Sequence, residues 1–317
     1  GASGPASAEQ WNAIVAAAEK EGKVTLYNAA TPSIQMRIKA AFEKAHPRIT
    51  LEWVRYGSGA LMAKIDQERS MGAEGADVAV STETAWFDRH GKQGLVKAPV
   101  GPARAGWPAN FLLNGMTPIL TMEPIVMMVN TNLVKTPVTG QKDLIRPEFK
   151  GRIGVEDLAS TFVFAWYDLV EKSEEPGYLA KLAAQQPRIY ASTVAGAQSV
   201  SAGEIAIANF VNMGAALDAV SKGAPVRVVM PNPAFANQYN AAILGWARRS
   251  NAAQVLVNFL MSPAGQESWS GDGASGSPLP NIPNALDARV MRSVDLTPYT
   301  PEFTKSYRVR FESMFKR

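Results

Sequence analysis

Hydroxyl-bearing residues follow a predicted strand and precede a predicted helix at four places in the sequence. A serine or threonine there caps the helix, and the helix start also presents unpaired backbone N–H groups and a positive dipole end. Ligands of open α/β sheets bind at these carboxyl ends of the strands. One such segment alone is typical of simple capping, but four predict a site for a small anion or an anionic group. The candidate ligand-binding residues are Thr31, Ser33, Ser58, Gly59, Ser81, Thr82, Glu83, Ser160 and Thr161.

Sequence motifs of enzyme active sites are missing. The chain contains no GxSxG and no GxxxxGK[ST], and Gly57-Ser58-Gly59 alone does not indicate a nucleotide-binding loop. His46 and His90 each end a predicted helix, where an imidazole interacts with the helix dipole. Glu83 follows a predicted strand, but no residue pairs with it as nucleophile and base. We therefore predict no catalytic residues, no cofactor and no enzymatic activity.

Composition excludes further classes of function. The 317 residues contain no Cys and two His, which excludes disulfide scaffolds, thiolate zinc sites, iron–sulfur clusters and cysteine nucleophiles. We predict no metal-ligating residues. The net charge of +4 is spread along the chain, so we expect no nucleic-acid partner. No apolar run reaches 18 residues, the length that predicts a membrane-spanning helix.

Alternating strands and helices position the candidate residues. Apolar and β-branched patterns predict strands at 24–27, 49–56 and 77–81, each followed by a helix, after a first helix over 9–21. This order predicts a mostly parallel sheet with helices on both faces. A break follows near 115–130, where Pro118 and Pro124 predict bends or an edge strand. The remaining segments, which include a short strand at 152–155, predict a second sheet with helices.

Several segments, taken in order, resemble one protein family. They read WNAIVAAAEKEGKVTLYNA at 11–29, YGSGALMAKI at 56–65, DVAVSTETAWFDRHGKQGLVKAP at 77–99, RPEFKGRIGVED at 146–157, GEIAIANFVN at 203–212 and ARRSNAAQVLVNFLMSPAGQESWS at 247–270. This series resembles the periplasmic solute-binding proteins of bacterial ABC importers, in particular the ferric-ion-binding type, over about residues 9–285.

The resemblance implies the type II periplasmic binding protein fold, an α/β fold of two lobes joined by two crossing hinge strands. The implied N-terminal lobe comprises residues 9–120 and 236–290, and the C-terminal lobe comprises 121–235 and 291–317. Residues 1–8 are expected to be flexible, whether native or a remnant of expression. The implied function is capture of a small ligand in the interlobe cleft by hinge closure. The implied partner is the membrane permease of an ABC importer. The protein is expected to be a periplasmic monomer whose export signal has been removed.

One departure from the ferric-binding type bears on the ligand. Ferric members carry two adjacent tyrosines after the segment equivalent to GEIAIA, whereas this chain has Asn209-Phe210-Val211-Asn212 there. Fe³⁺ prefers anionic oxygen donors, which these side chains lack. We expect Asn209, Phe210 and Asn212 to line the second-lobe side of the site, and an organic carboxylate or a phosphoryl or phosphonyl compound to be the ligand. A ferric or other metal ion with a synergistic anion is the alternative, and an α/β enzyme such as a transferase is the third.

Overall fold

The computed structural model describes residues 4–316, which form two compact units. Unit 1 contains residues up to 122 together with 238–289, and unit 2 contains 123–237 together with residues from 290 onward. The domain limits expected from the sequence lie at residues 120, 235 and 290. Of the segment expected to be flexible, residues 1–3 lie outside the described residues. Within the same segment, Ser7 already caps the first helix.

Unit 1 consists of a sheet with helices on both faces. Its parallel strands pair in the order β2-β1-β3, and the end of β11 pairs antiparallel with β3. Its elements are α1 (Ala8–Glu21), β1 (Lys23–Asn28), α2 (Pro32–Ala45), β2 (Thr50–Val54), α3 (Ser58–Ser70), β3 (Val78–Ser81), α4 (Thr84–Lys92), β4 (Val96–Lys97), β5 (Leu112–Leu113), the start of β6 (Thr117–Asn130), the end of β11 (Ala234–Leu244), α9 (Ser250–Leu260), α10 (Pro263–Ser270), β12 (Gly276–Ser277), β13 (Leu286–Asp287) and short 3₁₀ helices at Pro102–Gly106, Ala109–Phe111 and Ala288–Val290.

The first helix shows how local sequence sets an element's ends. The Ser7 side chain accepts a hydrogen bond from the backbone of Gln10, and the Gln10 side chain accepts one from the backbone of Ser7. Gly22 ends α1 with a positive φ of 75°, a conformation that glycine adopts without steric cost. The helix and the strand after it agree with the predicted pattern.

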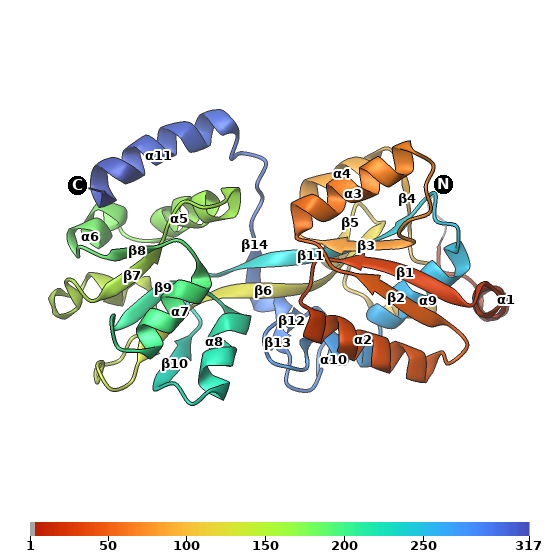
Figure 1. Cartoon of the computed structure of the whole chain (residues 1–317), viewed down its shortest axis with the longest axis horizontal. Helices are drawn as coiled ribbons and strands as arrows, with labels where there is room; N and C mark the ends of the chain where they lie inside the picture. Colours follow the sequence, from red (N-terminus) through yellow and green to blue (C-terminus); the bar gives the residue numbers. More distant parts are fainter. Residues whose placement is uncertain (1–3, 317) are drawn as a thin grey trace. The chain divides into compact units, whose positions relative to one another are not determined.

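One hydrophobic cluster of unit 1 lies between its sheet and the helices α3 and α4. In Figure 1, α3 and α4 cover one face of β1, β2 and β3, while α2, α9 and α10 cover the other. Leu61 and Ile65 of α3 and Phe87 of α4 pack against Tyr27 and Ala79 of the sheet. α3 follows β2 and α4 follows β3, so each of these two helices begins next to the carboxyl end of a strand.

Unit 2 repeats this plan with different connections. Parallel strands pair in the order β9-β7-β8, and β6 pairs antiparallel with β9 and with β10. Its elements are the end of β6, β7 (Ile153–Glu156), α5 (Thr161–Ser173), α6 (Tyr178–Ala184), β8 (Arg188–Tyr190), α7 (Thr193–Ser201), β9 (Ile207–Asn212), α8 (Met213–Ser221), β10 (Val226–Val229), the start of β11, β14 (Met291–Ser293), α11 (Pro301–Phe315) and short 3₁₀ helices at Gln141–Ile145 and Pro147–Phe149.

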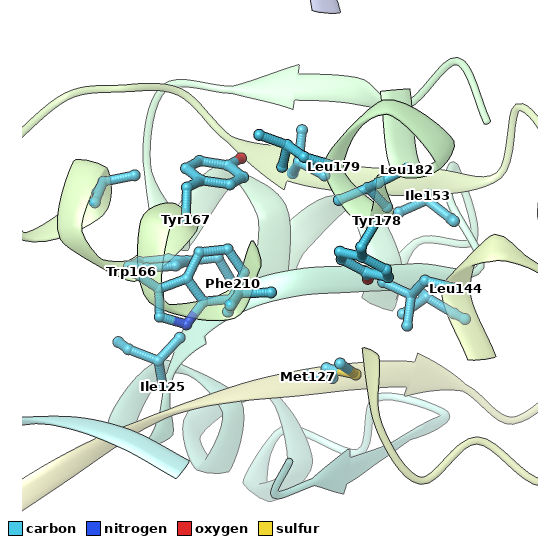
Figure 2. Close-up of a cluster of buried hydrophobic side chains, with 14 of the residues drawn as sticks. Ile125, Met127, Leu144, Ile153, Trp166, Tyr167, Tyr178, Leu179, Leu182 and Phe210 are labelled. Atoms are coloured by element: carbon cyan, nitrogen blue, oxygen red, sulfur yellow. The ribbon is translucent and has the colours of Figure 1, made fainter. Parts of the chain in front are cut away.

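Large aromatic side chains fill the core of unit 2. α5, α6 and α11 cover one face of its sheet and α7 and α8 cover the other (Figure 1). On the α5 face, Trp166 and Tyr167 pack among apolar side chains that include Tyr178 and Phe210 (Figure 2). Phe311 of α11 completes this core and has no accessible surface.

Two strands and one further segment carry the chain from one unit to the other. β6 runs as one strand through Pro118 and Pro124, and in unit 2 it pairs with both β9 and β10, so it is not an edge strand there. The second passage lies within β11, since β10 is a separate strand wholly inside unit 2. The third passage is at residues 289–290. Each unit is therefore built from segments that are far apart in the sequence.

Candidate ligand-binding site

In unit 1, three helices start at one edge of the sheet. Because β1, β2 and β3 are parallel, their carboxyl ends meet at the same edge, and α2, α3 and α4 begin there. None of these three helices has a side-chain cap, although Thr31 and Glu83 occupy the N-cap positions of α2 and α4. By contrast, Ser7, Ser192, Ser262 and Thr300 do cap their helices. The N-terminal N–H groups of α2, α3 and α4 thus have no side-chain acceptor.

Hydrogen bonds between hydroxyl groups join two of the three loops. The Ser58 Oγ atom accepts a hydrogen bond from Thr82 Oγ1 at 2.9 Å and from the Thr82 backbone N–H at 3.2 Å. This contact holds the start of α3 against the end of β3. Gly59 is exposed next to it, and no atom lies within 4 Å of the position where a Cβ would stand. The structure therefore brings Ser58, Gly59 and Thr82 together.

Ser81 is not at the surface. It has no accessible surface, and its hydroxyl donates to Met62 Sδ at 2.9 Å and accepts from the Glu83 N–H at 3.2 Å. Asn240 of β11 braces the same loop by donating to Ser81 O and to Thr84 Oγ1. Ser81 thus shapes the loop, whereas the side chain of Glu83 is exposed at its tip.

A buried amide pair supports the loop between β1 and α2. Asn28 Nδ2 donates to Gln35 Oε1, and Gln35 Nε2 donates to the carbonyl oxygens of Asn28 and Ala30. Thr31 and Ser33 are exposed on this loop, with their hydroxyl oxygens 3.3 Å apart. The sequence analysis identified the two hydroxyls but missed the amide pair that holds them.

The corresponding edge of unit 2 carries a second set of predicted residues. Ser160 and Thr161 are exposed at the start of α5, which has no side-chain cap. Asn212 ends β9, and its backbone N–H donates to Thr193 Oγ1 at 3.1 Å. Because β7, β8 and β9 are parallel, the ends of these strands meet at one edge of the sheet.

Asn209 and Phe210 lie in the interior of unit 2. The pairing of β6 with β9 shifts between Val126 and Met128, and this irregularity leaves both residues on the core face. Asn209 is 1% exposed and exchanges two hydrogen bonds with the Gln141 amide, at 2.8 and 3.1 Å. Phe210 is 7% exposed and packs edge-on against Trp166 at 5.0 Å between ring centroids, as Figure 2 shows. Both side chains thus have their contacts within unit 2.

Other residues at the two edges were missed by the sequence analysis. Ser192 and Thr193 follow β8 in the same strand–hydroxyl–helix pattern, which Ile189-Tyr190 signalled in the sequence. Arg55 is exposed at the end of β2, with no hydrogen-bond or ion-pair partner among residues 4–316. Glu156 ends β7 and is 5% exposed, and burial together with the nearby Asp157 raises its pKa to about 7.

The family model described as bacterial extracellular solute-binding protein matches residues 23–274. The chain belongs to this family. The resemblance seen in the sequence is thereby confirmed.

Solved structures of solute-binding proteins share the fold. A substrate-binding protein of an ABC transporter from Agrobacterium tumefaciens has a TM-score of 0.72 at 18% identity, covering 95% of this chain and 97% of that one. Iron-bound HitA from Pseudomonas aeruginosa has a TM-score of 0.69 at 19% identity, covering 92% and 99%. AfuA from Actinobacillus pleuropneumoniae, with fructose-6-phosphate bound, has a TM-score of 0.65 at 20% identity, covering 93% and 99%. No curated protein matches the sequence.

These comparisons confirm the predicted fold class, the type II periplasmic binding protein fold. Two further observations concern the described residues alone. Residues 4–316 contain no cluster of three or more His, Cys, Asp or Glu side chains arranged to hold a metal ion. Over the same residues, no helix has the length and apolar character needed to cross a membrane.

Proposed function

We propose that this solute-binding protein is the periplasmic capture component of an ABC importer and that its ligand carries an anionic group. The group is a carboxylate, a phosphoryl or a phosphonyl group on a small organic body. The protein captures the ligand by hinge closure, and the loaded protein then meets the membrane permease. The protein acts as a monomer and performs no chemistry on its ligand.

One observation carries the proposal: the uncapped starts of α2, α3 and α4 at one edge of the unit 1 sheet. Free N–H groups and positive helix ends bind anions without any net charge on the protein. The hydroxyls of Thr31, Ser33 and Ser58 add donors around them, since the Ser58 hydroxyl accepts from Thr82 and keeps its own proton. Arg55 supplies the one cation in the loops that follow β1, β2 and β3. This set of donors fits an oxyanion better than it fits a bare metal ion, because metal ions require acceptor ligands.

Thermal unfolding with a panel of probes tests the proposal. The probes are inorganic phosphate, ethylphosphonate, propionate, citrate, fructose 6-phosphate and Fe³⁺ with and without citrate. A probe at 100 times its Kd raises the free energy of unfolding by about 2.7 kcal/mol. We expect at least one organic anion to do so and Fe³⁺ alone to have no such effect. Stabilisation by Fe³⁺ with a visible charge-transfer colour, and by no organic anion, would overturn the proposal in favour of metal uptake.

Variants locate the effect of a responding anion. Thr82→Val removes the hydroxyl that donates to Ser58, and we expect it to weaken binding of the anion about tenfold. Ser70→Ala is the matched control. Ser70 lies at the end of α3, the helix that Ser58 begins, and it is exposed and donates only to Gln67 O. Equal affinity of the two variants would place the anion away from this edge.

A further inference from the structure

Glu156 is a buried carboxylate without a partner. It is the last residue of β7 and only 5% exposed, and within residues 4–316 no hydrogen bond or ion pair reaches its carboxylate oxygens. These oxygens keep some accessible surface, since the fully buried polar atoms that lack a partner are Thr117 Oγ1, Arg146 Nε and Tyr190 Oη. A carboxylate withdrawn from water without compensation is costly to the fold. The group therefore calls for a positively charged or hydrogen-bond-donating partner.

Side chains around Glu156 do not supply this partner. Tyr167 donates to the backbone oxygen of Glu156 at 2.5 Å and leaves the carboxylate free. The ring of Tyr190, which pairs with Glu156 across the strands, lies over Gly154, where an added Cβ would stand 2.7 Å from the ring. The Tyr190 ring thus extends away from the end of β7, over Gly154, and does not reach towards the Glu156 carboxylate.

Nearby cations are engaged elsewhere. Arg308 of α11 donates to Leu158 O at 3.0 Å, and Lys316 pairs with Asp157 at 3.2 Å. The segments that follow β7, β8 and β9 at this edge, residues 157–161, 191–193 and 212–213, contain no Lys or Arg. Asp157 instead adds a second negative charge and helps to raise the pKa of Glu156. The edge of unit 2 is therefore acidic and rich in hydroxyl groups.

We infer that Glu156 receives an amine group of the ligand, so that the ligand is a zwitterion with an ammonium group as well as an anionic group. The inference rests on the proposed function, in which the ligand carries an anionic group. An ammonium group has three donors, and the carboxylate of Glu156 with the hydroxyls of the same strand-end edge are acceptors for them. A metal ion is the weaker fit, because one carboxylate among hydroxyls supplies too few anionic ligands for a metal ion.

Matched probe pairs test this inference. Each pair differs by the amine alone: 2-aminoethylphosphonate and ethylphosphonate, phosphoethanolamine and ethyl phosphate, β-alanine and propionate. Affinities are measured by isothermal titration on the wild type, on Glu156→Gln and on Glu174→Gln. Glu174 is the control, because it is another desolvated glutamate with a raised pKa in unit 2, at the opposite end of α5.

We expect the amine-bearing member of at least one pair to bind the wild type about tenfold or more tightly. Glu156→Gln should remove most of this preference, and Glu174→Gln should retain it. Binding of the amine-free probes with equal affinity would overturn the inference and leave the anion proposal standing. A preference that survives in Glu156→Gln would equally overturn the role of Glu156. Failure of every probe would refute the proposed function itself.

Discussion

The two units have the same sheet plan but opposite chemistry at the edge where their strands end. Unit 1 presents uncapped helix starts, exposed hydroxyls and Arg55. Unit 2 presents hydroxyls beside two carboxylates, Glu156 and Asp157. Backbone architecture alone therefore does not determine what an edge of this kind binds. The side chain that ends each strand, and whether it is neutralised within the fold, makes the difference.

The largest expected effect separates core residues of unit 2 from its edge. Phe210→Ala should lower the free energy of unfolding by about 3–5 kcal/mol, because it leaves a cavity beside Trp166. Chemical denaturation measures this loss. Thr161→Ala, at the exposed start of α5, is the control and should change stability by less than about 0.5 kcal/mol. A mild effect of Phe210→Ala would show that this residue belongs to the edge.

The next effect depends on pH and concerns the acidic edge of unit 2. The raised pKa of Glu156, about 7, means that the folded protein binds this proton more tightly than the unfolded chain does. The stabilisation of the fold by this tighter proton binding is fully present below the unfolded pKa of about 4.5. It is lost as the pH rises to about 7, where Glu156 ionises in the folded protein. Glu156→Gln should thus stabilise the ligand-free protein by about 1–3 kcal/mol at pH 8.

Melting curves from about pH 4 to about pH 8, a range that includes the free and the raised pKa of glutamate, measure this pH dependence of stability. The gain of Glu156→Gln over the wild type should shrink towards the acidic end. Asp157 is the other carboxylate that acts on Glu156, while Arg308 and Lys316 contact its neighbours. A gain that is the same at every pH would contradict a raised pKa for Glu156.

A smaller effect concerns the joined loops of unit 1. Thr82→Val removes the hydrogen bond to Ser58 and should cost about 1 kcal/mol in the free energy of unfolding, since the hydroxyl is only partly buried. Denaturant titration with Ser70→Ala as the reference gives the value. Loss of several kcal/mol would mean that the contact is part of the fold's core and unsuited as a probe of binding.

The smallest effect is expected at the tip of the loop between β1 and α2. Ser33→Ala should leave stability within about 0.5 kcal/mol of the wild type, because Ser33 is exposed and the buried Asn28–Gln35 pair holds the loop. Gln35→Leu is the informative contrast. It should cost about 1–3 kcal/mol by leaving Asn28 without its partner. Equal stability of the two variants would argue against the amide pair as the support of this loop.

Much of the fold follows from local pattern, and the site follows only in part. Helical spacing of apolar residues predicted α1 and α2. The Ser and Thr residues that follow strands indicated the edge of unit 1. The predicted strand at 152–155 stopped short of Glu156, because that residue joins β7 through its pairing with Tyr190, 34 positions later (190 − 156). The irregular pairing that turns both Asn209 and Phe210 inward is equally non-local. Their role as ligand contacts remains a prediction.

The three passages of the chain between the units affect how the protein is made. Synthesis through residue 122 leaves unit 1 without β11 and α9, which pack on its first strands only after unit 2 has been largely translated. Unit 2 in turn waits for Phe311 to seal its core. Domains whose segments are continuous fold one after another as they emerge from the ribosome. In this chain, by contrast, neither core can be completed before the segments beyond residue 238 have been synthesised.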